Sequence, residues 1–415
     1  MLNHKTTRLA GAMAKRATQI SNFILLGSGY LTVVVGLFLY SFTQVDLSLT
    51  LSEWSVWQVI QKFFQHIGYF QRPLSTFLYI AIVLLLYLFY FLFLRLSRIG
   101  GIRDIGGIWG LVIATTIILT FSYNAFSYDL FNYMFDAKIV TYYHQNPYEH
   151  KALEYLGDPM LSFMHGVHRT YPYGLVWLIL TVPLSLGINF FLPTFFLFKL
   201  LASLSFLGTV FFIGKILNKF SPQNEVFAIV FFALNPLVLI ESLVSAHNDI
   251  VMMFFAVWAL YLLLSKKYTR SIILLVLSIG VKFATVLLVP VFLYIAIKQL
   301  RKQSIDFKKV FMIIFVLMTI AVVITSFASG INKNPEIQPW YFLMLFPFAN
   351  FVAQKRIIVF LTISMSFAML ASYIPYILTG EWPKDIVGLK NMLLTTSIIG
   401  AVFLSIVLHK RFIHR

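Results

Sequence analysis

The chain contains no cysteine and few charged residues. With no Cys among its 415 residues, it has no disulfide, no thiolate metal ligand and no cysteine nucleophile. Charged residues make up only 11% of the chain, whereas a soluble domain has about a quarter. Hydrophobic residues make up 60%, and several apolar runs approach the roughly 20 residues that cross a bilayer as a helix. These features exclude a soluble enzyme, a disordered chain and an outer-membrane barrel, whose strands would alternate polar and apolar residues.

Motifs for nucleotide binding and for catalytic zinc are also missing. The chain has no Walker A, GxGxxG, kinase or HExxH pattern, and Gly100-Gly101 and Gly106-Gly107 lack the strand and Lys-Ser/Thr context of a phosphate loop. The spacing of His165 and His168 suits a metal, but without cysteine or HExxH this signal is weak. We therefore assign no metal ligand, and a divalent cation is the one cofactor left open.

Apolar segments run through the whole chain. Their hydropathy predicts an all-α, polytopic transmembrane bundle of about 12 spans, with a long external loop that bears interfacial helices. The predicted spans are residues 21–43, 74–95, 107–123, 192–214, 225–243, 249–265, 271–281, 283–298, 309–329, 340–352, 356–378 and 391–408. The apolar segment Tyr173 to Gly187 is only about 15 residues long and contains Pro183, so we expect it to lie in the outer interface.

The placement of the charges explains the net charge of +17. If the N-terminus is cytoplasmic, 22 of the 32 basic residues fall in cytoplasmic segments, together with only Asp104, Glu225 and Asp306 among the acids. This bias follows the positive-inside rule, and anionic lipid accounts for the net charge without any nucleic acid. The first 20 residues are basic and precede an apolar segment without a small-residue cleavage site, which predicts an anchor. We expect a multi-pass protein of the inner (cytoplasmic) membrane with both termini in the cytoplasm.

One long connection, from about residue 124 to 191, falls outside the cytoplasm in this topology. Residues 127–143 have a helical period that places Asp129, Asn132, Tyr133 and Asp136 within an arc of about 100°, which predicts an interfacial helix with a polar face. Asp129 lies at membrane level, where partial desolvation suits a carboxylate to accept a proton from a hydroxyl. Capping of the helix, or a solvated acid, is the alternative. Because Asp129 and Asp136 are about 10 Å apart along the axis, they cannot chelate one metal ion.

Further polar residues fall at the same outer side. Charges inside a bilayer are functional candidates, and those away from the cytoplasmic helix ends are Lys199, Glu241, Asp249 and Lys282. Asn235-Pro236 should kink the fifth span, and His247, Asn248 and Asp249 form a polar outer turn whose alternative role is helix capping. Lys282 separates two apolar pieces and should lie toward the outer leaflet, where it binds a lipid phosphate or pairs with a buried acid. Trp340 and Tyr341 suit a sugar platform or an aromatic belt equally well.

At these residues the chain resembles the GT-C superfamily of integral-membrane glycosyltransferases, in particular the polyprenyl-phosphate-mannose-dependent mannosyltransferases of the bacterial α-1,6-mannopyranosyltransferase type. The resemblance covers about residues 108–345. It is carried by Asp129-x-x-x-Tyr133, His144 to Tyr148, Tyr171 to Gly174, Asn235-Pro236-Leu237, His247-Asn248-Asp249, Lys282 and Pro339-Trp340-Tyr341. The chain departs from the family's acidic pairs, because Asp129 has no adjacent second acid.

The resemblance implies a transferase that inverts the sugar carbon, with Asp129 as general base. It implies a polyprenyl-phosphate-linked sugar as donor, mannose by family default, and a lipid-linked or envelope glycan as acceptor in contact with membrane lipid. The donor phosphate would be met by Lys282, His247 and Arg169, and sugar or acceptor by Asn132, Tyr133, Asn248, Asp249, Trp340 and Tyr341. The expected parts are an N-terminal anchor with two spans (1–106), a GT-C-like core (107–345) and C-terminal spans (346–415). A secondary transporter or lipid flippase is the main alternative, because twelve spans with both ends inside are common among transporters.

Overall fold

The computed structural model describes residues 23–102, 104–329 and 335–413. This described part is all helical, with 77% helix and no strand, which confirms the predicted fold class. After a first helical segment, Phe23–Gln44, come α2 (Ser55–Gln65), α3 (Arg72–Arg98), α4 (Ile105–Thr120), α5 (Asp129–Thr141), α6 (Leu175–Thr181), α7 (Phe191–Phe220), α8 (Glu225–Ala233) and α9 (Pro236–Leu239). Then follow α10 (Asp249–Leu264), α11 (Tyr268–Val281), α12 (Val289–Leu300), α13 (Phe307–Ser329), α14 (Phe342–Val352), α15 (Arg356–Ala371), α16 (Ile374–Thr379) and α17 (Ile386–Ile413).

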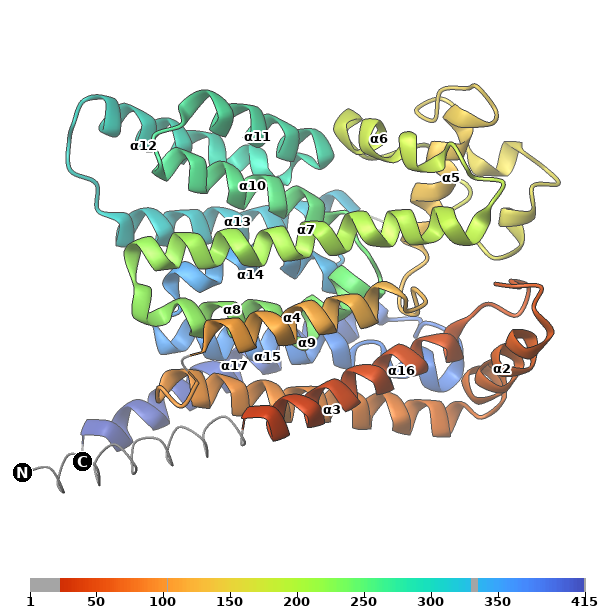
Figure 1. The fold of residues 1–415 in the computed structure, drawn as a ribbon, viewed down its shortest axis with the longest axis horizontal. Coiled ribbons are helices and arrows are strands. Elements are labelled where there is room, and N and C mark those ends of the chain that lie inside the picture. Colours follow the sequence, from red (N-terminus) through yellow and green to blue (C-terminus); the bar gives the residue numbers. More distant parts are fainter. Residues whose placement is uncertain (1–22, 103, 330–334, 414–415) are drawn as a thin grey trace, which may run out of the picture.

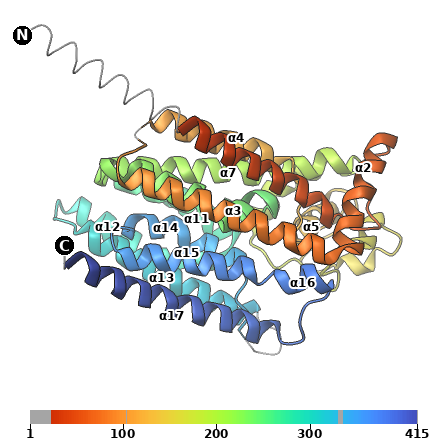
Figure 2. The ribbon, with the colours of Figure 1, turned by 90° about the horizontal axis from the view of Figure 1, so that it is seen from below.

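The long helices lie side by side with their axes roughly along one direction, and α2, α5 and α6 gather at one end of the bundle (Figures 1 and 2). Helix α10 packs between α7 and α11, α13 packs on α14, and α15 packs on α17. Several apolar side chains of α13, spaced three or four residues apart, remain exposed: Ile313, Val316, Ile320, Ile324 and Phe327. Such a stripe is unfavourable in water and fits contact with lipid.

Seven described helices are long and apolar enough to cross a membrane, or eight if a bent pair counts as one span. The predicted number of about 12 is therefore not confirmed. The difference lies in five shorter apolar helices, Ile105–Thr120, Leu175–Ser185, Asp249–Leu264, Tyr268–Val281 and Pro339–Val352. A helix rises 1.5 Å per residue, so most of these are too short to cross about 30 Å of hydrocarbon on their own. Part of the topology argument, including Lys5, Arg8, Lys15, Arg16, Arg103 and Arg415, lies outside the described residues.

The bend expected at Asn235-Pro236 is present. The helices on either side of it differ in direction by 58°. The side chain of Asn235 accepts hydrogen bonds from the backbone N–H groups of Leu237 and Val238, so the helix begins again directly after the break. The whole segment 227–253 is buried, and the His247 turn lies within it.

The end of this bent segment is held by a buried lysine. Lys199 of α7, with no exposed surface, donates to the backbone carbonyls of Leu243 and Val244, the latter at 2.8 Å. It also donates to Ser122 Oγ at 3.1 Å. Ser122 belongs to the segment that leads into α5. Lys199 therefore ties the His247 turn to the segment that carries Asp129, and it satisfies carbonyls that would otherwise be unpaired at a helix end.

The helix predicted over residues 127–143 is present as α5, but it does not expose the predicted polar face. In α5 every residue from Leu130 to Ile139 is buried, polar ones included. The reason is that the rest of the long connection folds back over the helix. Lys138 forms an ion pair with Asp158, Nζ to Oδ2 2.5 Å, and Phe131 packs edge-on against Phe163 at 5.0 Å between ring centroids. The helix is thus enclosed by its own connection.

Candidate active site

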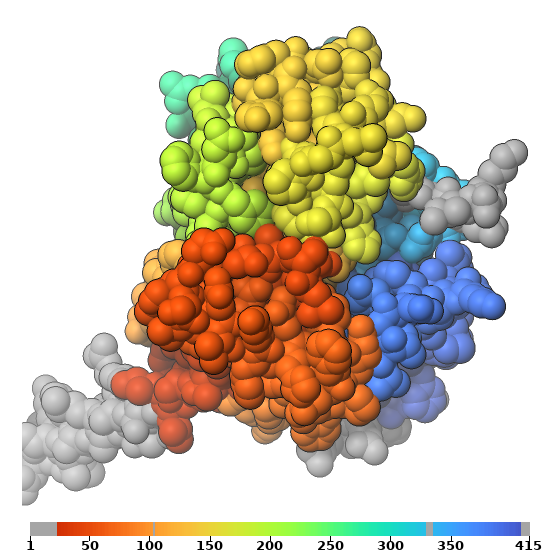
Figure 3. Space-filling model, turned by 90° about the vertical axis from the view of Figure 1, so that its right-hand side faces the viewer, coloured from red at the N-terminus to blue at the C-terminus, as the bar shows by residue number. Residues whose placement is uncertain are grey.

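A cavity of about 710 Å³ lies at the end of the bundle that holds α5. Figure 3 looks onto this end, where segments near residues 45–75, 125–190 and 336–390 meet. All three contribute to the lining, which is Gln44, Tyr69, Arg72, 125–129, Asn132, His165, Gly166, Arg169, Glu336, 338–340, Tyr373, Tyr376, Ile377, 380–382, Ile386 and Lys390. Of the predicted site residues, Asp129, Asn132, Arg169 and Trp340 line this cavity.

Asp129 is the first residue of α5, as the periodicity predicted. Its backbone N–H donates to Ser127 Oγ at 3.1 Å, and Asn132 Nδ2, one turn on, reaches its Oδ1 at 3.5 Å. The carboxyl group therefore does not cap its own helix and is 26% exposed to the cavity. The position at a helix N-terminus favours its charged form, because the helix dipole is positive there.

Behind Asp129 lies a buried chain of titratable groups. His247 Nδ1 is 3.5 Å from Asp129 Oδ2, and His247 Nε2 is 3.3 Å from Glu241 Oε2, distances of ion pairs rather than of short hydrogen bonds. The hydroxyl of Tyr373 donates to Glu241 Oε1 at 2.9 Å. The imidazole also stacks on Trp340, 4.2 Å between ring centroids.

The pKa values of Asp129 and His247 move in opposite directions. Burial raises the pKa of the Asp129 carboxyl, but contact with His247 and the charge of Arg169 outweigh it, so the pKa lies below its usual value. Burial lowers the pKa of His247, but Asp129 and Glu241 outweigh it and bring the pKa to about 9. At neutral pH the structure therefore holds an ionised Asp129 against an imidazolium, in a position to accept a proton from a molecule in the cavity.

We expect this pairing to make the stability of the protein depend on pH. Because the pKa of His247 is raised from 6.5 to about 9, its contribution is complete below pH 6.5 and is lost as pH rises through about 9. A shift of this size corresponds to at most about 3 kcal/mol. Asp129 also stabilises the protein, but with the opposite pH dependence. Because its pKa is lowered, its contribution is complete above the usual pKa of an aspartate and is lost as pH falls below that value. Thermal unfolding of the detergent-purified protein between pH 6 and 10 measures the effect.

A His247→Gln variant is the control for this pH dependence. Glutamine fills a similar space but does not titrate, so the loss of stability between pH 6.5 and 9 should become shallower. If the wild type and His247→Gln lose stability equally steeply over this range, His247 is not the group responsible.

Arg169 lines the same cavity. Its Nη1 and Nη2 have no hydrogen-bond partner, and its nearest carboxylate is Asp136, with Nη1 3.7 Å from Oδ2. Burial raises the pKa of Asp136 to about 7, even though Arg169 lowers it. Asp136 is therefore only partly charged at neutral pH and balances Arg169 incompletely. Buried guanidinium donors without partners favour an anionic ligand such as a phosphate.

Lys282 lies in a different setting from Arg169. It sits at the break between α11 and the next helical piece, as expected, but its Nζ is 3.0 Å from both carboxylate oxygens of Asp249. It also lies over the ring of Tyr341, 5.5 Å from the centroid. None of these three residues lines the cavity. The ion pair with a buried acid, which was the alternative for Lys282, is thus present.

The remaining predicted site residues do not line the cavity. Tyr133 packs edge-on against Tyr173 and Trp177, with ring centroids 5.2 Å away in each case. His247 and Asn248 have no exposed surface, so neither reaches a ligand directly. Asn248 precedes α10 but makes no side-chain capping hydrogen bond. Among the described residues, no three His, Asp or Glu side chains come together as metal ligands.

Sequence reasoning missed the partners of these residues and most of the C-terminal wall. Glu241 was noted only as a charge inside the membrane, and nothing in the sequence placed it behind Asp129. Glu336, Tyr373, Trp382 and Lys390 belong to no recognisable motif. The one available signal was their position near predicted outer helix ends.

Comparison with known proteins assigns the chain to a family. Residues 28–298 match the family described as alpha-(1->6)-mannopyranosyltransferase, N-terminal domain. No curated protein and no solved structure matches the chain significantly. The match includes Asp129, Arg169 and His247 and spans more than half of the chain. The chain therefore belongs to the alpha-(1->6)-mannopyranosyltransferase family and is a membrane mannosyltransferase of the GT-C type.

Proposed function

We propose that the protein transfers mannose from a polyprenyl-phosphate donor to a glycan acceptor, on the outer face of the membrane and with inversion at the sugar carbon. The observation that carries this proposal is the presence of Asp129 and Arg169 in one cavity. Asp129 is a carboxylate kept ionised by His247, and Arg169 has guanidinium donors without partners. A base and an anion site in the same cavity suit transfer from a phosphate leaving group.

In the proposed reaction, Asp129 accepts the proton of an acceptor hydroxyl. The hydroxyl oxygen then bonds to the anomeric carbon of the sugar, from the side opposite the phosphate. The bond between that carbon and the phosphate oxygen breaks, and the lipid phosphate leaves with the electron pair. Arg169 stabilises the charge that develops on the leaving phosphate. Because the attack and departure occur on opposite faces, the configuration at the carbon inverts.

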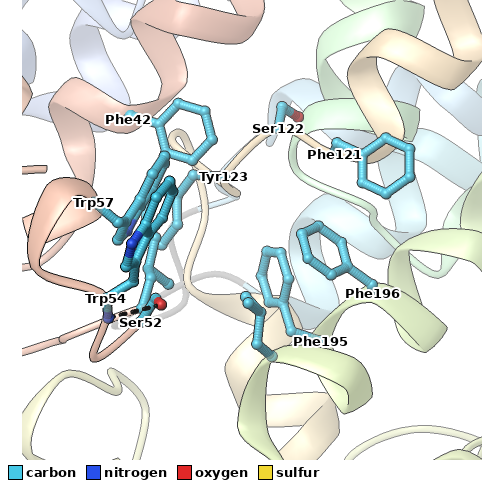
Figure 4. Close-up of a pocket in the computed structure, with 11 residues that line it drawn as sticks. Phe42, Ser52, Trp54, Trp57, Phe121, Ser122, Tyr123, Phe195 and Phe196 are labelled. Atoms are coloured by element: carbon cyan, nitrogen blue, oxygen red, sulfur yellow. Dashed lines mark hydrogen bonds between the residues drawn. The ribbon is translucent and has the colours of Figure 1, made fainter. Parts of the chain in front are cut away.

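A second cavity supports a donor with a long apolar chain. It has a volume of about 320 Å³ and is lined almost only by apolar side chains (Figure 4). Its walls are Phe42, Leu51, Ser52, Trp54, Trp57, 121–123, Leu192, Phe195 and Phe196. Residues 121–123 line this apolar cavity, and residues 125–129 of the same segment line the active-site cavity. An isoprenoid chain bound in the apolar cavity would leave its phosphate close to the active-site cavity.

The charge distribution supports an external active site. Helix α3 runs from Arg72, at the active-site cavity, to Arg98, at a polar cavity that Arg356 also lines. At 1.5 Å per residue its 27 residues place these two ends about 40 Å apart. The Arg98 end carries Arg95, Arg98 and Arg356, which were assigned to the cytoplasm from sequence. The active-site cavity lies at the other end, which the positive-inside rule assigns to the outer face.

Transfer of radiolabelled mannose tests the proposal. The full chain, reconstituted in vesicles, should move label from polyprenyl-phosphate mannose to an oligomannoside, and should not use nucleotide-linked mannose. NMR of the product should show the opposite anomeric configuration to that of the donor. Use of the nucleotide-linked donor instead would overturn the donor assignment. Counterflow uptake without any covalent product would favour a transporter.

A further inference from the structure

One wall of the active-site cavity comes from a part of the chain beyond the family match. The match ends at residue 298, whereas Glu336, Gln338, Tyr376, Trp382 and Lys390 all line the same cavity as Asp129. These five residues are called the C-terminal wall below. They come from three separate places: the segment before α14, the helix α16 with the turn after it, and the first turns of α17.

The C-terminal wall carries an aromatic platform. Trp382 is 44% exposed and stacks on Tyr376, with ring centroids 4.8 Å apart and planes at 25°. The turn that brings Trp382 back onto α16 requires Gly380, whose φ of 85° is rarely adopted by other residues. A half-exposed tryptophan in a cavity offers a flat apolar surface to a ligand.

Beside the platform, the polar groups of the wall are balanced in charge. Lys390, only 3% exposed, donates from Nζ to Glu336 Oε1 and to Gln338 Oε1, both at 2.8 Å. Its charge is therefore already neutralised by a carboxylate. Glu381, another cavity residue, adds a second acid on this side. Arg72, which also lines the cavity here, donates from Nη1 to the backbone carbonyl of Ile377 at 3.3 Å, so this side holds cations that already have partners, in contrast to Arg169.

We propose that the C-terminal wall is the acceptor subsite and holds a neutral hexose unit of the acceptor glycan. A pyranose ring has an apolar C–H face that packs on an indole, and hydroxyls that both donate to carboxylates or amides and accept from an ammonium group. The inference rests on the proposed function, because it assigns the donor phosphate to the Arg169 side. It also assigns the choice of acceptor to the part of the chain outside the family match.

Steady-state kinetics of Trp382→Ala test the subsite. Loss of the platform should raise the KM for an oligomannoside acceptor about 10-fold or more, because truncating a buried aromatic anchor commonly costs this much in binding. The KM for the lipid-phosphate donor should stay unchanged. Trp382→Phe, which keeps an aromatic face, should recover much of the affinity. Leu378→Ala is the matched control, because Leu378 is an exposed residue of α16 that does not line the cavity.

Protection from oxidation tests the same contact without any variant. Oligomannoside added to the wild-type protein should slow hydroxyl-radical oxidation of Trp382, read by mass spectrometry, but not that of Trp54, which lies outside this cavity. A Trp382→Ala variant that raises the donor KM and spares the acceptor KM would overturn the subsite, as would equal oxidation of Trp382 with and without sugar. Absence of transfer by the wild type would instead refute the proposed function.

Discussion

Replacing Asp129 with Asn is expected to reduce mannosyl transfer by about 10²–10⁴-fold, the usual contribution of a positioned general base. The amide has nearly the same shape as the carboxyl group but cannot accept the proton of the acceptor hydroxyl. Its backbone contact with Ser127 does not involve the side chain, so α5 should begin at the same residue. The initial rate of transfer at saturating donor and acceptor measures the effect.

The matched control for Asp129→Asn is Glu149→Gln. Glu149 is an exposed acid of the same long connection, and its side chain accepts a hydrogen bond only from Asn146 among the described contacts. The control should transfer at the wild-type rate. A rate close to wild type for Asp129→Asn itself would remove Asp129 from the role of base and, with it, the mechanism proposed above.

Replacing Arg169 with Met is expected to raise the KM for the lipid-phosphate donor by about 10–10²-fold. Hydrogen bonds to charged groups contribute about 1.5–3 kcal/mol, and each 1.4 kcal/mol is tenfold in affinity. Methionine keeps part of the apolar stem but removes every donor, together with the guanidinium group that lies over the ring of Tyr173. The rate at saturating donor should also fall, because the same donors stabilise the charge on the leaving phosphate.

Arg169→Lys separates the charge of Arg169 from its geometry, and Lys151→Ala is the matched control. Arg169→Lys keeps the charge but loses the planar pair of donors, so its donor KM should lie between those of wild type and Arg169→Met. Lys151→Ala removes an exposed cation from the same connection and should leave the donor KM unchanged. An unaltered donor KM in Arg169→Met would show that another cavity cation, such as Arg72, meets the phosphate.

Features set by neighbouring residues were predictable from the sequence. The break at Asn235-Pro236 follows from the geometry of proline and from the capping ability of asparagine. The start of α5 near Asp129 and the break at Lys282 follow from apolar periodicity. The assignment to the GT-C type follows from short motifs in the right order, and the family match confirms it.

Burial and pairing were not predictable in the same way. A period of 3.6 residues shows which side chains share a face of α5, but not that residues 142–190 cover that face. The sequence was equally compatible with Lys282 as a phosphate ligand and as an ion-pair partner, because it does not show that Asp249 Oδ1 lies 3.0 Å from Lys282 Nζ. The predicted number of spans is not confirmed, because hydropathy counts every apolar segment, and a short apolar helix can be buried inside a bundle without crossing the membrane.

The sequence by itself determined that this is an all-helical membrane protein, that Asp129 begins a helix in its longest connection, and that Arg169 lies in the same connection. These conclusions depend on composition and on local periodicity, which can be read from the sequence without knowing how distant segments pack. Only the tertiary structure decided that His247 and Glu241 lie behind Asp129, and that Trp382 and Lys390, from the C-terminal part of the sequence, line the same cavity. Contacts between residues more than 100 positions apart depend on how the helices pack, and no local pattern encodes that.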